Sequence, residues 1–166
     1  MLAGCSDSKE PAAAKLPAST CFGAFAPTEL EPFMGTGEEV RVDAPADVRL
    51  TAERKSAICT IDVDGQPRFS ALVERLPAGQ HFFWAPSLDQ QKPEALPFAE
   101  NSKVWDGGAA VFLTCHGLTD AFELKVWIDG SAEQIKPDER RPLFSELMNK
   151  YLAFAKHQNQ CGMKTG

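Results

Sequence analysis

Alternation of apolar and polar residues along 122–126, continued by Ile128, is the feature that most constrains what this chain can fold into. The positions of one parity are occupied by Phe122, Leu124, Val126 and Ile128. Glu123 and Lys125 lie between them. Because successive side chains of a strand point to opposite faces, this segment predicts a β-strand with one dry face and one wet face.

Further strands are indicated earlier in the chain. Segment 57–63 alternates in the same way, and segment 68–76 returns with the same period. Asp64-Gly65 between them is a hairpin signal, although Pro67 predicts a loop longer than two residues. Shorter strands are expected at 40–42, 103–105 and 109–115. The pattern is typical of an antiparallel sheet.

An amphipathic helix is predicted from about residue 141 to residue 160, with Pro142 in its first turn. Its apolar stripe, at helical spacing, consists of Leu143, Phe144, Leu147, Met148, Tyr151, Leu152 and Ala155. A shorter N-terminal helix is expected where Thr28 and Glu31 match a capping box and Gly35 follows to end the helix. The predicted fold class is α+β: an antiparallel sheet with the C-terminal helix packed on one face.

Five cysteines suggest where the chain is located. The segment Leu2-Ala3-Gly4-Cys5 matches a lipobox, so residues 1–4 are interpreted as the remnant of a lipoprotein signal peptide and Cys5 as the lipidated residue. Residues 5–20 are rich in Ser, Ala, Lys and Pro and predict a flexible tether, with a short Ala-rich helix at 12–16 as the alternative. A single domain is then expected over 21–162.

The other four cysteines are Cys21, Cys59, Cys115 and Cys161. An even number outside the cytoplasm indicates two disulfides. We favour Cys21–Cys59 and Cys115–Cys161, because each bond would join a helical end of the domain to a strand. The alternative pairs Cys59 with Cys115 and Cys21 with Cys161.

The charges and motifs narrow the range of functions. The formal net charge is −6, and basic residues do not cluster beyond Arg140-Arg141, which argues against a nucleic-acid partner. None of the three histidines (His81, His116 and His157) lies in a catalytic or metal-binding motif, and no phosphate-binding loop is present. We therefore expect no enzymatic activity, no cofactor and no metal.

Aromatic residues are concentrated in and after the proline-rich segment 81–101. Phe83, Trp84, Phe98 and Trp105 are candidates to line an apolar groove for a ligand or partner. The alternative is that this segment only covers the open end of the sheet.

Several of these features occur together in one family. Cys5, Cys21, Cys59, the turn Trp105-Asp106-Gly107-Gly108, Cys115 and Cys161-Gly162 give the chain an arrangement that resembles small secreted lipoproteins of actinobacteria, of the DUF3558 type. The resemblance implies a Mog1/PsbP-like fold and supplies no catalytic residues.

The expected function is that of a binding or accessory protein of the cell envelope, held at the outer face of the cell membrane by lipid on Cys5. Its partner would be an envelope protein or a small apolar ligand. The alternatives are an envelope-acting hydrolase whose active site follows no known motif, and a structural subunit of an envelope complex.

Overall fold

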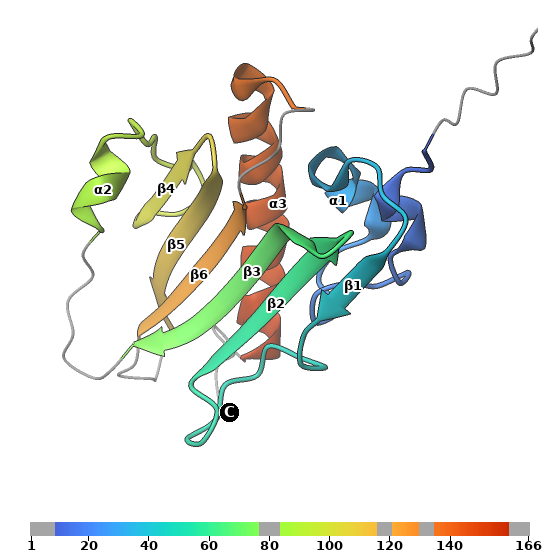
Figure 1. Ribbon diagram of the computed structural model, residues 1–166. Coiled ribbons are helices and arrows are strands. Elements are labelled where there is room, and N and C mark those ends of the chain that lie inside the picture. Colours follow the sequence, from blue (N-terminus) through green and yellow to red (C-terminus); the bar gives the residue numbers. More distant parts are fainter. Residues whose placement is uncertain (1–8, 77–83, 116–120, 130–134, 160–166) are drawn as a thin grey trace, which may run out of the picture.

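The computed structural model describes residues 9–76, 84–115, 121–129 and 135–159. One six-stranded antiparallel sheet is formed in the order β1-β2-β3-β6-β5-β4 (Figure 1). Its strands are β1 (Val40–Asp43), β2 (Ser56–Val63), β3 (Gln66–Leu76), β4 (Ser102–Trp105), β5 (Gly108–Thr114) and β6 (Ala121–Ile128). The helical elements are η1 (Ala12–Lys15), α1 (Pro27–Met34), α2 (Pro86–Asp89) and α3 (Pro137–Gln158).

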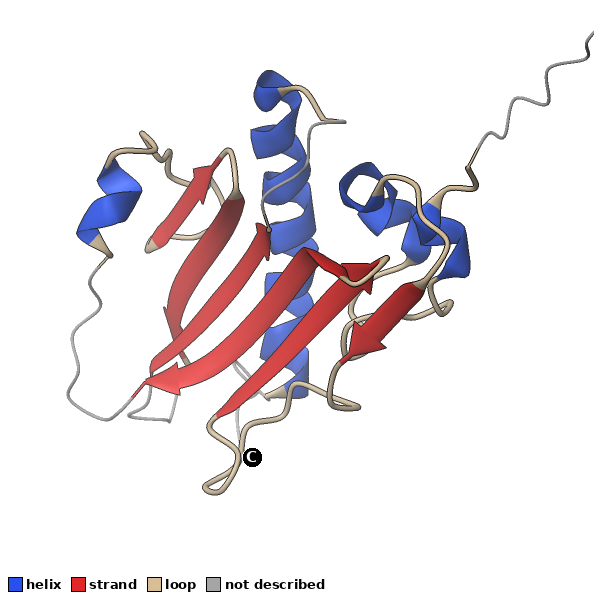
Figure 2. Cartoon of the chain, viewed as in Figure 1, coloured by secondary structure: helices blue, strands red, loops and turns tan. Residues whose placement is uncertain are grey.

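The long helix α3 crosses one face of the sheet, which confirms the predicted α+β class (Figure 2). The core lies between α3 and the face of the sheet that carries Phe69, Val73 and Leu124, all of which are buried. From the helix, the buried residues are Phe144, Leu147, Met148, Tyr151, Leu152 and Ala155. We call this covered side of the sheet the core face and the opposite side the outer face.

The hairpin between β2 and β3 is tighter than predicted. Val63 pairs with Gln66, so the loop consists of Asp64 and Gly65 alone. Both residues have positive φ (52° and 73°), as a type I′ turn requires. The prediction of a longer loop from Pro67 is wrong because a register shift after Ile61 accommodates the proline, which has no N–H to donate to the ladder.

Helix α3 begins four residues earlier than predicted. Pro137 occupies its first turn, and Pro142, which was expected there, lies inside the helix. Pro142 removes only the hydrogen bond that would reach the carbonyl of Asp138, close to the helix start, so the helix continues through it. Asn159 ends the helix, where its N–H donates to the carbonyl of Ala155 at 3.0 Å.

Helix α1 is capped differently from the predicted Thr28–Glu31 box. The N–H of Ala26 donates to Glu29 Oε2 at 2.7 Å, and Glu29 is the acidic residue of the first turn. Gly35 ends the helix with φ 65°, as predicted. The box was placed two residues too late because Pro27, not Thr28, opens the helix.

The second half of the predicted tether belongs to the folded domain. The N–H of Ala12 donates to the carbonyl of Gly35 at 2.9 Å, and Ala12, Ala13 and Leu16 are buried. Lys15 Nζ donates to the carbonyls of Gly37 and Glu38 at 3.0 and 2.8 Å. The short helix that was the disfavoured alternative is therefore present as η1, because its small alanines pack closely beside α1.

The Cys21–Cys59 disulfide is formed, as predicted. It joins the segment before α1 to a buried residue of β2, and it excludes the alternative pairing of Cys59 with Cys115. Cys115 is disulfide-bonded as well. Its predicted partner Cys161 and the predicted lipidation site Cys5 lie outside the described residues.

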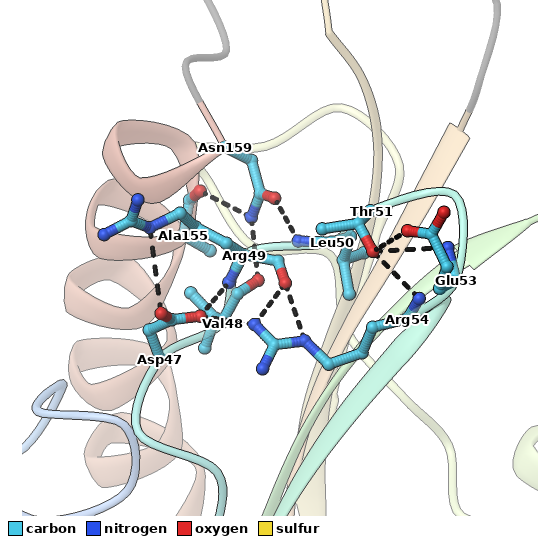
Figure 3. A network of polar contacts seen from close by, with 9 residues as sticks. All are labelled: Asp47, Val48, Arg49, Leu50, Thr51, Glu53, Arg54, Ala155 and Asn159. Carbon is cyan, nitrogen blue, oxygen red and sulfur yellow. Dashed lines mark hydrogen bonds and ion pairs between the residues drawn. The ribbon is translucent and has the colours of Figure 1, made fainter.

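The end of α3 also holds the segment between β1 and β2 (Figure 3). Asn159 Nδ2 donates to the carbonyl of Val48 at 3.2 Å, and Asn159 Oδ1 accepts the N–H of Leu50 at 3.0 Å. Within the segment, the guanidinium of Arg54 binds the Asp47 carboxylate and the carbonyl of Arg49. The Arg54 hydrogen bond is the main cause that lowers the pKa of Asp47 below its ordinary value, against a small opposing effect of burial.

Candidate ligand groove on the outer face

Aromatic and charged side chains from strands β4, β5 and β6 lie on the outer face of the sheet, near the edge formed by β4. In the ladder Trp105 pairs with Gly108, and Gly108 pairs with Trp127 on the next strand. The two indoles therefore flank a residue without a side chain. Lys125 lies two residues before Trp127 and so projects from the same face.

These residues line a groove of about 580 Å³. Short helix α2 forms one wall, and β5 and β6 form the floor. Its aromatic lining consists of Trp84, Trp105, Phe112 and Trp127, and its charged lining of Glu123 and Lys125. Leu88 of α2 packs with Trp105 and Ala110 in a small apolar cluster separate from the main core. A groove of this volume with few polar groups fits a small organic ligand.

The turn between β4 and β5 shapes the groove through Gly108. A Cβ atom at this position would lie 2.3 Å from the carbonyl oxygen of Val126 and 3.0 Å from Cζ2 of Trp105. Only glycine therefore lets β5 approach β6 here while the Trp105 indole lies against the strand. Gly107 is also close to this ring, since its Cβ would lie 3.2 Å from Trp105 Nε1.

Two lysines lie over the indole rings. The ammonium of Lys125 is 5.1 Å from the ring centroid of Trp127 and 5.9 Å from that of Trp105. The ammonium of Lys103 is 5.2 Å from the ring centroid of Trp84 and 3.6 Å from Asp89 Oδ1. Cations over ring faces are attracted by the quadrupole of the ring, so both side chains are held in place.

Glu123 is the acidic residue of the groove. Burial raises the pKa of this carboxyl; Lys125 opposes the shift and the carboxylate of Glu74 adds to it. Glu74 is the direct cross-strand neighbour of Glu123 on β3. The groove therefore contains a carboxyl group whose ionisation is disfavoured by its surroundings.

Arg141 of α3 fixes the wall of the groove from the edge of the sheet. Its Nε donates to Asp106 Oδ1 at 2.7 Å, and its Nη1 donates to Glu94 Oε1 at 2.7 Å. The same guanidinium donates to the carbonyls of Lys92 and Gln91 at 3.0 and 3.1 Å. One arginine thus ties the turn after Trp105 to the loop that follows α2.

A second hollow of about 480 Å³ lies between α1 and α3. Glu29 and Lys150, which form an ion pair, belong to its lining, and the lining contains no aromatic side chain. The aromatic groove is therefore the stronger candidate site.

Of the predicted ligand-binding residues, the structure brings Trp84 and Trp105 together in the groove. Phe98 instead packs against the main core, and Phe83 lies outside the described residues. Phe98, in the segment after α2, thus packs against the core, whereas Trp84 and α2 line the groove. That this groove binds a ligand or partner stays a prediction.

Sequence reasoning missed Trp127 and Phe112. Trp127 lies on the same side of the strand as Glu123 and Lys125, the residues predicted to face outward. A large aromatic residue on the solvent-facing side of this strand was the signal that could have identified it. Phe112 gave no such signal, because its segment is almost wholly apolar.

The described residues show no sign of a metal site or a membrane-spanning helix. Within the described ranges, no group of three or more His, Cys, Asp and Glu residues could hold a metal ion. His157 is exposed on α3, and His81 and His116 lie outside the described residues. Among the described helices, none is long and apolar enough to cross a membrane. No family model, curated protein or solved structure matches the chain.

Proposed function

We propose that this chain is an extracytoplasmic binding protein of the cell envelope, anchored by lipid on Cys5, and that the aromatic groove is its binding site. The observation that carries the proposal is the convergence of Trp84, Trp105 and Trp127 on one groove of about 580 Å³. Large apolar pockets with a few polar groups are the usual form of a small-molecule site. A small ligand with an apolar body is the occupant that suits this lining.

The disulfides support the proposed location. Cys21–Cys59 is formed and Cys115 is disulfide-bonded, and such bonds persist mainly in oxidising compartments. Lipid on Cys5 would supply two acyl chains, which anchor a protein stably where one chain is marginal.

Two observations favour the proposal over its two alternatives. A structural subunit would need a broad apolar surface, whereas Ile58 is the one large apolar side chain of the described residues that is clearly exposed (48%). The hydrolase alternative expects a histidine beside a carboxylate in a polar cleft. Its candidates, His81 and His116, lie outside the described residues, and the groove itself is mainly apolar.

The binding site is tested with N-phenylnaphthylamine, an uncharged fluorophore that emits strongly in apolar surroundings. We expect saturable binding to the full chain, and we expect Ser87→Phe to abolish it because Ser87 is an exposed residue of α2 that lines the groove. The control is Ser56→Phe, an exposed serine on the outer face of β2 that does not line the groove and is two strands from Glu123. Equal binding by both variants would overturn the proposed site.

The location is tested by the intact mass of the protein isolated from its native host. A mature chain that begins at Cys5 and carries a diacylglyceryl group is the expected result. An unlipidated chain would remove the proposed anchor without affecting the groove.

A further inference from the structure

We infer that the groove selects a small amphiphilic anion, whose apolar body lies among the tryptophans and whose acidic head group binds Lys125. This inference rests on the proposed function, since it names the chemical class of the ligand for the same groove. It follows from how the two lysines and the ring faces are arranged.

Lys125 is an ammonium with unused donors at the centre of an apolar groove. It lies over Trp105 and Trp127, and within the described part of the chain it forms neither an ion pair nor a hydrogen bond. Glu123 acts on Lys125 only at longer range. A lysine ammonium carries three donors, and its hydrogen bonds to a charged acceptor are stronger than those to a neutral one. An anionic head group would supply that acceptor.

Lys103 adds a second positive charge in the same row of the sheet. Lys103 pairs with Ala110, and Ala110 pairs with Lys125, so the two lysines flank one small residue on the outer face. Their backbones are about 10 Å apart, two strand spacings. Asp89, the partner of Lys103, is a largely exposed residue of α2, which leaves this ion pair weakly held. The backbones of the two lysines therefore lie on either side of Ala110, and Lys125 is the one of the two that lines the groove.

The same arrangement argues against two other ligand classes. A sugar that stacks on tryptophan needs an open ring face, but Trp105 is buried and Lys125 lies over Trp105 and Trp127. A cationic ligand would need those ring faces too, and it would meet the charge of Lys125 already in place. An anion with an apolar body needs neither face to be open.

The experiment compares two probes that share one ring system. Anilinonaphthalene sulfonate carries a sulfonate that N-phenylnaphthylamine lacks, so their affinities for the full chain separate the head group from the body. We expect Lys125→Met to weaken the sulfonate probe about tenfold, the loss of one charge-assisted contact, and to change the neutral probe less than about twofold. Lys156→Met, on the exposed side of α3, is the matched control and should change neither.

Two further variants control for misfolding and for non-specific effects of charge. Lys125→Arg keeps the cation and should retain most of the affinity for the sulfonate probe. Glu123→Gln removes the negative charge of the groove and should strengthen the sulfonate probe while the neutral probe is unchanged. A cationic ligand class would predict the reverse order for these variants.

The outcomes separate this inference from the proposed function. If Ser87→Phe leaves both probes bound, the groove is not the site and the proposed function fails. If Ser87→Phe blocks the neutral probe but Lys125→Met leaves the sulfonate probe unaffected, or weakens both probes equally, the groove binds ligands without selecting anions. That result would overturn the inference alone.

Discussion

The two faces of the sheet use large aromatic side chains in opposite ways. On the core face, Phe69 is fully buried and contacts the rings of Phe25 and Phe33 at centroid distances of 5.8 Å. On the outer face, Trp127 is only half-buried. The ammonium of Lys125 lies over its ring, and the ring lines the groove. The comparison teaches that a ring enclosed in the core contributes to stability, whereas the half-buried Trp127 keeps part of its surface free for binding.

The largest effect is expected from breaking the core side of this comparison. Phe69→Ala should lower the free energy of unfolding by about 4 kcal/mol, because it removes a buried ring and leaves a cavity. Trp127→Ala should cost only about 1 kcal/mol, because the ring is partly solvated, but it should weaken binding of both probes. Urea unfolding followed by circular dichroism measures the free energy of unfolding of both variants. Equal costs for the two variants would show that the faces do not differ as described.

Removing the disulfide should separate stability from binding. Cys21 and Cys59 are 38 residues apart, so Cys21→Ala with Cys59→Ala should destabilise the fold by about 4 kcal/mol in the chain-entropy account. The bond lies on the β1–β3 side, away from the groove, so probe affinity should be unchanged in the folded variant. A large loss of affinity below the unfolding transition would contradict the separation of the two regions.

Arg141 is expected to have a smaller effect on stability and a selective one on the groove. Arg141→Gln should cost about 1 kcal/mol, since its ion pairs with Asp106 and Glu94 involve partly exposed carboxylates. The wall that carries α2 should then be held less firmly, and both probes should bind several-fold more weakly. Lys136→Gln, an exposed residue just before α3, is the control for loss of a nearby positive charge.

The smallest effect is expected from Glu123, whose contribution to stability depends on pH in the opposite sense to that of Asp47. Because the pKa of Glu123 is raised in the folded state, its contribution to stability is present at low pH and is lost as pH rises through the raised pKa. Glu123→Gln should therefore stabilise the fold at neutral pH by about 0.5 kcal/mol, the size of a like-charge cross-strand pair, and should have no effect below the ordinary pKa of Glu.

Asp47 provides the opposite sign for comparison. Arg54 lowers the pKa of Asp47, so the stability that Asp47 contributes is present above its ordinary pKa and is lost as pH falls. Asp47→Asn should accordingly destabilise the fold at neutral pH and have little effect in acid. Thermal unfolding across pH would show both trends, and parallel curves for the two variants would contradict them.

The strands and the long helix could be predicted because their signals are local. Alternation placed β2, β3 and β6 with the correct buried parity, and spacing identified the stripe of α3. The groove could not be predicted in full, because its wall depends on Arg141 reaching a loop about 50 residues earlier in the chain. The first helix η1 was also undervalued: a composition rich in Ala and Pro describes a free tether and a close-packed segment equally well.

The order of the strands has a consequence for how the chain folds. Strands β1, β2 and β3 pair with their neighbours in sequence, and so do β4, β5 and β6, which leaves β3–β6 as the one pairing between distant segments (Figure 1). Each meander can form through short loop closures, whereas joining them requires a long one. The register of β3 against β6 should therefore be the slow step of folding, after which α3 has a continuous surface on which to dock.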